Sequence, residues 1–416
     1  MSLARAERSL GLNISEEQIQ EMEAHIKDIP FELVQEIERE TNHDVVAHIR
    51  AYAAQCPKAA PIIHLGATSA YIVDNADARI LKDATKVILL RIGSLIQVMA
   101  DLAHQCKDIP TLAYTHFQPA QPTTFGKRVC MWLQDLEDDY GRLKYECRNG
   151  IHALGCKGAT GTCASFMELF NGDYGKVKEL DRQISARLGI ESVKVSGQTY
   201  SRKYDYYLFS VLSGVAQTLS KIANDLRLMS GRGEFYEPFD DNQVGSSAMA
   251  YKQNPLRCEK VVSLSRLVIS NATVMANTAS NQWLERSLDD SAIRRVIIPE
   301  TFIALDEMLT TMGKVLARGS VRTDVMWENV RQELPKMVSE GVLMLAVGRG
   351  GDRQELHEAI RRYAILSPRG FLEAILDDDR FDISGNEMEE LADPAKLVGA
   401  APTQVEEYLR KFELED

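Results

Sequence analysis

Three long segments of this chain repeat apolar residues alternately four and three positions apart, and no other feature constrains the fold as strongly. The segments cover residues 88–102, 208–229 and 302–316. A 3.5-residue repeat lines the apolar side chains along one seam of a helix, as in near-parallel helix bundles. The stretch 204–229 has no proline and a single glycine, so it predicts one helix roughly 35–40 Å long. One such stripe is typical of any buried helix, but three together favour an all-α fold built on a long-helix bundle.

The composition excludes several classes of protein. With 416 residues, 45% hydrophobic and 26% charged, the chain is neither disordered nor a small disulfide-stapled scaffold. Its formal charge of −12 disfavours nucleic acid as a partner, although a local basic pocket for a small anion is compatible with it. Seven scattered cysteines without a CxxC pair indicate reduced thiols in a cytoplasmic protein and no zinc site. With neither a signal-peptide pattern nor a run of about 18 apolar residues, no membrane span is expected.

The chain is expected to form three domains. We assign residues 1–68 to an N-terminal helical domain, 69–321 to the central long-helix bundle, and 322–416 to a small C-terminal helical domain. The last boundary follows a change to shorter helical patterns and acidic clusters. The segment 3–12 is typical of the second half of an amphipathic helix, so we expect the N-terminal domain to be truncated at its start.

Two irregular stretches between the helical patterns carry residues suited to chemistry. One, residues 107–126, contains three prolines that break any helix, and it places His116 beside Thr115. Histidine titrates near neutral pH and suits proton transfer, although a lone loop histidine is more often structural. The other contains GSSAMAYKQNP, residues 245–255, where Lys252 and the backbone N–H groups before a helix suit a carboxylate. A plain turn and helix cap explain this second stretch equally well.

A third cluster, WLERSLDDSAIRR at residues 283–295, gathers the donors that a phosphate prefers. It combines Arg286, Arg294 and Arg295 with Ser287 and Ser291. A phosphate site on an acidic protein needs such a local concentration of positive charge. The alternative is a solvated helix face whose arginines pair with the neighbouring aspartates.

Together these segments resemble the fumarase/aspartase superfamily. GSSAMAYKQNP is similar to its signature loop, THFQPAQPTTFGKR to its histidine segment, and HLGATSAY to its threonine–serine segment. The segments GQTYSRK, GCKGATGT and LERSLDDSAIRR resemble the animal-type adenylosuccinate lyase family rather than argininosuccinate lyases or fumarases. The resemblance runs from about Leu3 to Glu358 and continues loosely to the end of the chain.

The resemblance implies a β-elimination. Adenylosuccinate would be split into AMP and fumarate, and the related ribotide SAICAR into AICAR and fumarate, two steps of purine nucleotide synthesis. The implied fold is the three-domain fumarase/aspartase type, with the central bundle completed in a homotetramer and each active site shared between subunits. No metal and no organic cofactor are implied.

The resemblance also carries roles to individual residues. Ser246 matches the family's catalytic base, His116 the acid that protonates the leaving nitrogen, and His43 a second histidine that supports the site. From the residues alone a histidine would be the expected base, because the free pKa of a serine hydroxyl lies far above neutrality. The matching substrate-binding positions are Asp44, Thr68, Ser69, Thr115, Gln198, Lys252, Asn254, Lys260, Arg286, Ser291 and Arg295. Among them, Thr115, Gln198, Lys252 and Asn254 match the carboxylate site, and Arg286, Ser291 and Arg295 match the phosphate site.

The chain departs from the family pattern at three points. Asn42 stands where the animal-type pattern has Arg, and Lys260 stands where Arg is usual, which keeps the charge but loses the bidentate fork. The third departure is at the start of the chain. Family members have, before the position that matches Leu3, a stretch with an Arg-Tyr pair at the phosphate, and this sequence does not include it. Two alternatives therefore stay open. One is another fumarate-releasing lyase of the superfamily, for which Arg286 and Arg295 would be dispensable, and the other is a non-catalytic truncated homologue.

Overall fold

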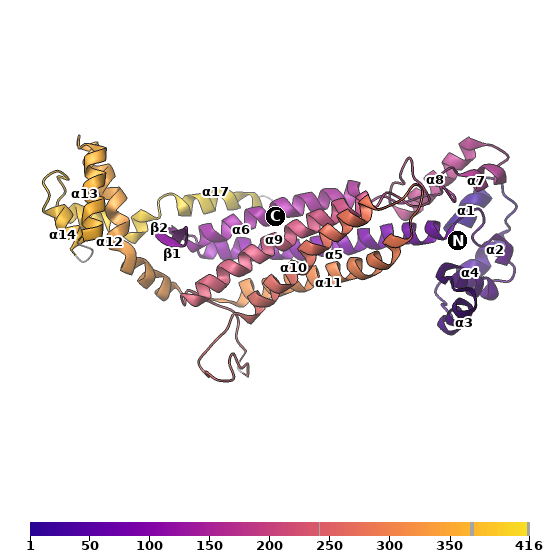
Figure 1. Cartoon of the computed structure of the whole chain (residues 1–416), viewed down its shortest axis with the longest axis horizontal. Helices are drawn as coiled ribbons and strands as arrows, with labels where there is room; N and C mark the ends of the chain where they lie inside the picture. The colour runs from indigo at the N-terminus through magenta and orange to yellow at the C-terminus, as the bar shows by residue number, and fades with distance from the viewer. Residues whose placement is uncertain (241, 367–369, 414–416) are drawn as a thin grey trace. The chain divides into compact units, whose positions relative to one another are not determined.

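The computed structural model describes residues 1–240, 242–366 and 370–413, and helices make up most of them (Figure 1). The longest are α5 (Ser69–Gln105), α6 (Phe125–Tyr145), α9 (Lys203–Gly231), α10 (Leu256–Ser280), α11 (Asp289–Arg318) and α12 (Thr323–Gly348). The strands in the described residues form two short antiparallel pairs, β1 (Pro110–Thr115) with β2 (Gln118–Thr124) and β3 (Phe235–Tyr236) with β4 (Ser320–Val321). The all-α prediction is confirmed.

The three predicted seams are buried. In α9 every seam residue from Leu208 to Met229 is at most 4% exposed, and those of α5 and α11 are at most 9% exposed. Among the described helices, α5 is also long and apolar enough to cross a membrane by length and composition alone. Core helices of globular proteins pass the same test, and the seam of α5 packs inside the protein.

The chain divides into two compact units, which long helices pass through. Unit 1 comprises Met1–Leu90, Gly141–Gly214 and Leu267–Leu305, and unit 2 comprises Arg91–Tyr140, Val215–Arg266 and Asp306–Asp416. Helices α5, α6, α9, α10 and α11 contribute turns to both units. The division into domains at residues 1–68, 69–321 and 322–416 stays a prediction.

Contacts between the long helices build the bundle within each unit. In unit 1, α9 packs on α11 through Phe209 and Phe302, whose ring centroids lie 6.4 Å apart edge to face. Residues of α10 and α11 also meet there, because buried Asn271 donates to Thr301 Oγ1 at 2.8 Å. In unit 2, α5 and α11 are joined by an ion pair in which Arg91 Nε lies 2.8 Å from Asp306 Oδ1.

Local sequence signals set the ends of the shorter helices of unit 1. These elements are α1 (Ser2–Ser9), α2 (Glu16–Ala24), α3 (Phe31–Thr41), α4 (Asp44–Gln55), η1 (Ala60–Ile62), η2 (Glu146–Gly150), α7 (Ala164–Leu169) and α8 (Tyr174–Leu188). A capping box starts α2, since Ser15 and Gln18 each accept the other's backbone N–H. Asp173 caps α8 in the same manner through Lys176 N. Helix α1 packs on α8 around buried Leu3 and Leu180.

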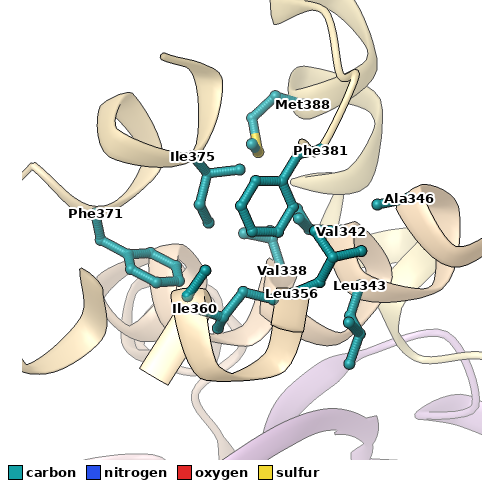
Figure 2. Close-up of a cluster of buried hydrophobic side chains, with 11 residues drawn as sticks. Val338, Val342, Leu343, Ala346, Leu356, Ile360, Phe371, Ile375, Phe381 and Met388 are labelled. Atoms are coloured by element: carbon teal, nitrogen blue, oxygen red, sulfur yellow. The ribbon is translucent and has the colours of Figure 1, made fainter. Parts of the chain in front are cut away.

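The C-terminal elements of unit 2 share one apolar core. They are α12, α13 (Arg353–Leu366), α14 (Phe371–Leu376), α15 (Gly385–Leu391), α16 (Pro394–Leu397) and α17 (Ala401–Glu413). Figure 2 shows Val342 of α12, Leu356 of α13, Ile375 of α14 and Met388 of α15 gathered around Phe381, which is fully buried. This cluster therefore joins the long α12 to α13 and to the two short helices α14 and α15, which are too short to be stable alone.

The stretch 107–126, predicted to be irregular, instead forms the β1–β2 hairpin. Thr115 pairs with Gln118, so His116 and Phe117 alone make the turn, and both have positive φ (53° and 60°). Two left-handed residues match the right-handed twist of the flanking strands, but the usual Asn-Gly signal for such a turn is missing. A two-stranded sheet also tolerates prolines, because its outer edges need no N–H donor.

We expect Leu219→Ala in α9 to lower the free energy of unfolding by about 2–5 kcal/mol, because Leu219 is fully buried on the seam and truncation leaves a cavity. Leu228→Ala in the same helix is the matched control. Its side chain is 51% exposed, and a change within about 0.5 kcal/mol is expected. Chemical denaturation of both variants measures the difference. Equal losses would contradict the conclusion that the seam of α9, and not its exposed face, stabilises the bundle.

The pH dependence of stability should report on Glu7 of α1. This side chain is fully buried, and neither carboxylate oxygen has a hydrogen-bond partner in the described residues. Burial raises the pKa of Glu7 from the ordinary 4.5 to about 8. Between these values the folded chain holds a proton that the unfolded chain releases, so stability falls as the pH rises.

Thermal unfolding between pH 4 and 9 tests this. Glu7→Gln should unfold at a higher temperature than the unsubstituted chain near pH 8, and the advantage should shrink towards pH 4.5. Glu36→Gln, at an exposed position on α3, is the control and should keep the original pH profile. A Glu7→Gln profile parallel to that of the unsubstituted chain would mean that Glu7 is ionised in the folded state.

Candidate active site

The predicted site residues fall into two sets, one in each unit. Unit 1 contains His43, Asp44, Thr68, Ser69, Gln198, Arg286, Ser291 and Arg295. Unit 2 contains Thr115, His116, Ser246, Lys252, Asn254 and Lys260. In the described part of unit 2, no hydrogen bond or ion pair joins His116 to Ser246. Each set is a partial site with its own chemistry.

In unit 1, His43 and Ser69 meet at the start of two helices. His43 is the N-cap of α4, and its Nδ1 accepts the backbone N–H of Val46 at 3.4 Å. Its Nε2 lies 3.5 Å from Ser69 Oγ at the first position of α5. Thr68 directly precedes this helix, so both hydroxyls lie where the helix dipole favours negative charge.

The departure at Asn42 has a structural reason. Asn42 ends α3 with φ 49° and ψ 34°, in the left-handed region. Asparagine adopts this conformation more readily than arginine, because its short side chain can form local hydrogen bonds. The substitution therefore suits the tight passage from α3 to the N-cap of α4.

Asp44 and Arg295, far apart in sequence, form an ion pair beside His43. Arg295 Nη2 lies 2.7 Å from Asp44 Oδ2, and the backbone N–H of Val45 donates to Oδ1 at 2.7 Å. Burial opposes ionisation, but these two donors outweigh it and lower the pKa of Asp44 below its ordinary value. The pair holds the Arg295 guanidinium at the partial site while leaving it 64% exposed to a ligand.

A second part of the unit 1 set brings Gln198 to Arg286. Gln198 donates its backbone N–H to the carbonyl of Glu285 at 2.9 Å, and its side chain donates to the carbonyl of Ala159 at 3.0 Å. The preceding Gly197 permits this approach, since a Cβ there would lie 2.4 Å from the Glu285 carbonyl oxygen. Sequence analysis missed the role of this glycine, because only the folded chain brings residue 285 to it.

Behind this partial site, Arg202 forms a buried ion pair on each side. It donates to both oxygens of Asp74 on α5, at 2.9 and 3.2 Å, and its Nε donates to Asp290 Oδ2 at 2.6 Å. All three side chains are at most 2% exposed. Arg286 Nη1 shares the same Asp290 oxygen at 3.3 Å, so the buried group also orients Arg286. This network was not predicted.

Arg294 anchors the neighbouring part of the network. It donates to Asp205 Oδ2 and to Tyr200 Oη, both at 2.8 Å, and lies 3.0 Å from Asp77 Oδ2. Burial lowers the pKa of Arg294, but Tyr200 and Asp205 more than compensate and raise it, so the guanidinium stays charged. Arg294 is thus directed into the protein, whereas the adjacent Arg295 faces the partial site.

Ser291 lies in the first turn of α11 between Arg286 and Arg295. Its backbone N–H donates to the Leu288 carbonyl at 3.1 Å. Two guanidinium groups and a hydroxyl at a helix N-terminus form a basic region suited to a phosphate.

In unit 2, the signature loop folds around the hydroxyl of Ser246. Ser246 Oγ accepts the backbone N–H groups of Ala248 and Met249 at 3.3 and 3.1 Å. An oxygen that accepts two backbone donors holds negative charge more readily than a free hydroxyl. The loop is closed at its base, because Asn254 donates to the Gly245 carbonyl at 2.8 Å.

Lys252 and Lys260 are placed differently. Lys252 is an exposed residue of the signature loop, and its backbone packs so tightly on Gly245 that a Cβ there would lie 2.1 Å from the Lys252 carbonyl oxygen. Lys260, on α10, forms an ion pair with Glu307 of α11 and lowers the pKa of that carboxyl below its ordinary value. The Lys260 ammonium is thus held between helices.

The tip of the β1–β2 hairpin presents His116. Its position in a two-residue turn, beside Thr115 at the end of β1, leaves the imidazole exposed. Left-handed φ at two non-glycine residues costs of the order of 1 kcal/mol each, so the surrounding structure must impose it. Arg128 of α6 contributes to that support by donating to the carbonyl of Leu112. In the part of the chain that the structure describes, no group of three or more His, Cys, Asp or Glu is arranged to hold a metal ion.

Comparison with known proteins places these segments among lyases. The family model described as "Lyase" matches residues 2–270, and the one described as "Adenylosuccinate lyase C-terminus" matches residues 335–408. The adenylosuccinate lyase of Saccharomyces cerevisiae is 41% identical over 99% of this chain and 88% of the relative. The adenylosuccinate lyase of Schistosoma mansoni is 43% identical over 98% of this chain and 87% of the relative.

Solved structures share the fold. A fumarate lyase from Mesorhizobium sp. BNC1 superposes with a TM-score of 0.87 and 25% identity, covering 98% of this chain and 92% of the other. The 3-carboxy-cis,cis-muconate lactonizing enzyme of Pseudomonas putida gives 0.84 at 22% identity, covering 99% and 92%, a likeness of fold alone.

The two adjacent arginines of α11 give a sharp test of the buried network. Arg294→Ala should lower the free energy of unfolding by about 3–5 kcal/mol, because it strands buried Asp205 beside the uncompensated Asp77. Arg295→Ala removes a largely exposed ion pair and should cost at most about 1 kcal/mol. Chemical denaturation measures both, and similar losses would show that the network contributes little to stability.

Proposed function

The chain belongs to the adenylosuccinate lyase family, and from that membership we propose that it splits adenylosuccinate into AMP and fumarate by β-elimination, with Ser246 as base and His116 as acid. It is accordingly a carbon–nitrogen lyase. The same chemistry on SAICAR would release AICAR and fumarate, since both substrates carry the succinyl group on nitrogen.

One observation carries the assignment of the base. Serine needs help to act as a base, because its alkoxide is unstable in water. The two backbone N–H groups that Ser246 Oγ accepts, from Ala248 and Met249, are donors that stabilise such an oxyanion. With this support, Ser246 removes the proton from the carbon beside the succinyl carboxylate.

Breaking the carbon–nitrogen bond then requires a proton on the leaving nitrogen. His116 is suited to supply it, because an exposed imidazole at a strained turn is both accessible and held in position. His43 supports the site through Ser69, whose Oγ lies 3.5 Å from its Nε2. Once protonated, the nucleotide leaves as a neutral amine and fumarate remains.

The substrate's charges are matched by two groups of donors. Proton loss spreads negative charge into the succinyl carboxylate, and Lys252, Asn254, Thr115 and Gln198 hold it there, with Thr68 and Ser69 as further contacts. Arg286, Ser291 and Arg295 hold the phosphate, Asp44 lies near the purine, and Lys260 adds positive charge. The buried Asp290 that orients Arg286 and the Asp44 pair that orients Arg295 support this division.

We also propose that the active enzyme is a homotetramer whose sites combine segments of different subunits. Apolar side chains along the long helices of unit 1 are solvent-exposed in the single chain, among them Ile80 and Leu90 of α5 and Ile303 of α11, which are 58–73% exposed. Exposed apolar rows on bundle helices favour burial against other copies. Shared sites would also bring His116 to a Ser246 of another subunit.

The proposed location is the cytoplasm. All seven cysteines are free thiols, and all but Cys163 are buried. Reduced thiols are typical of a compartment that keeps glutathione reduced.

The direct test is an assay of the purified chain with adenylosuccinate that follows purine absorbance and fumarate together. Equimolar AMP and fumarate are expected. Ser246→Ala should lower kcat by at least about 100-fold, the usual contribution of a positioned base. Ser247→Ala, an exposed neighbour, is the matched control and should retain most activity. Unchanged turnover in Ser246→Ala would remove that residue from the mechanism.

The acid is tested separately. His116→Ala should lose turnover to a similar extent, because the leaving nitrogen departs poorly as an anion. A substrate analogue with a better leaving group should recover activity in His116→Ala but not in Ser246→Ala. Recovery in both variants, or in neither, would contradict the division of roles. Absence of fumarate release by the unsubstituted chain would point to a non-catalytic homologue.

A further inference from the structure

A cavity of about 710 Å³ lies in unit 2 beside the root of the signature loop. Its walls are the C-terminal ends of α9 and α11, the β3–β4 pair with the residues that follow β3, and the last residues of the loop, 251–255. Cavities of roughly 300–1,000 Å³ are the usual size for small-molecule and cofactor sites. Of the residues that line it, the proposed elimination uses two from the signature loop, Lys252 and Asn254.

The cavity is basic in a chain that is acidic overall. Four cationic side chains line it, Arg227, Lys252, Arg318 and Arg322, together with one carboxylate, Glu237. Two of these cations have carboxylate partners outside the lining, Arg227 with Glu259 at 3.8 Å and Arg322 with Asp324 at 3.0 Å. Both Glu237 oxygens already accept backbone N–H groups at the start of α10, at 2.6 and 2.9 Å. Among the described residues Arg318 has no ion-pair partner. The cavity is therefore suited to an anion with several charges.

Aromatic side chains share the same lining. Tyr236, Phe239 and Tyr251 contribute rings, and Tyr251 is 83% exposed. Tyr236 on β3 pairs with Ser320 on β4, so its ring lies on the strand face shared with Ser320 and, two residues on, Arg322. Rings beside guanidinium groups are the combination that binds a nucleobase by stacking and its phosphates by charge-assisted hydrogen bonds.

We propose that this cavity binds a nucleoside polyphosphate, as a second nucleotide site besides the substrate phosphate site at Arg286 and Arg295. Arg318, which has no ion-pair partner in the described residues, lies in this lining with Arg227, Lys252 and Arg322, and this grouping matches the several charges of a polyphosphate better than the two charges of a monophosphate. The aromatic lining supplies the surface for the base.

Occupancy of the cavity restrains the signature loop. Residues 252–254 form one wall, and Asn254 ties them to the Gly245 carbonyl at 2.8 Å. Because Gly245 packs against the Lys252 carbonyl with no room for a Cβ, any shift of this wall is passed to Ser246. A bound polyphosphate therefore slows turnover, because it restrains the loop whose Lys252 and Asn254 are proposed to hold the succinyl carboxylate. This regulatory consequence rests on the proposed function, whereas binding itself does not.

Calorimetric titration of the full chain with ATP tests the site. Arg318→Gln should weaken ATP binding by about tenfold or more, which corresponds to about 1.4 kcal/mol for one lost charge-assisted contact. Arg331→Gln is the matched control, because this α12 arginine is exposed and its contacts in the described residues are with Glu328 and Trp327 of its own helix. Without ATP, both variants should split adenylosuccinate at the unsubstituted rate. With ATP, inhibition should persist in Arg331→Gln and fade in Arg318→Gln.

The possible outcomes separate the explanations. ATP binding that is lost in Arg295→Gln but kept in Arg318→Gln would place ATP in the substrate site and overturn the proposal, as would the absence of any ATP binding. Tripolyphosphate binding as tightly as ATP would overturn the nucleotide assignment. ATP binding that depends on Arg318 in a chain without lyase activity would uphold the cavity while refuting the proposed function.

Discussion

The buried pairing of Arg202 and Arg294 with aspartates is the constraint on which unit 1 depends. These guanidinium groups join α5, the start of α9 and the start of α11, where Asp74, Asp205 and Asp290 are nearly inaccessible to water and Asp77 is 30% exposed. Removing charge from water is costly, so this arrangement is stable only when every partner is present. The positions of these side chains can therefore vary little. Arg286, which shares Asp290 with Arg202 and whose side chain is 25% exposed, is held at the edge of this rigid group, where a ligand can reach it.

In both units, rigid helices support polar groups that lie at the helix ends. Long helices with buried seams supply a rigid frame, and the groups suited to chemistry lie where the helices stop. The signature loop precedes α10, the residues proposed to bind the phosphate lie just before α11 and in its first turns, and His116 lies in the hairpin turn before α6. Close backbone contacts at Gly197 and Gly245 fix these loops, because only glycine leaves room for the neighbouring carbonyl. The candidate site residues thus lie on loops and helix ends, and the packed long helices hold them in position.

The net charge of the chain and its local charge have opposite signs. The chain is acidic overall, yet it has local groups of cations, with Arg286 and Arg295 near the start of α11 in unit 1 and four cationic side chains around the cavity beside the signature loop in unit 2. Net negative charge discourages unspecific binding of polyanions, while local clusters retain small phosphorylated molecules. An enzyme whose substrate and product are nucleotides needs both properties.

The apolar repeat by itself determined the helices and their seams, because helical periodicity is a local property that neighbouring residues impose on one another. Family motifs also determined which residues to expect at the site. The sequence did not determine the β1–β2 hairpin, since His116 and Phe117 adopt left-handed turn conformations that their residue types disfavour. Nor did it distinguish Arg294, buried in the network, from Arg295, exposed beside Asp44. These outcomes were decided by tertiary structure, because the conformation of a strained turn and the direction of a side chain depend on partners distant in sequence.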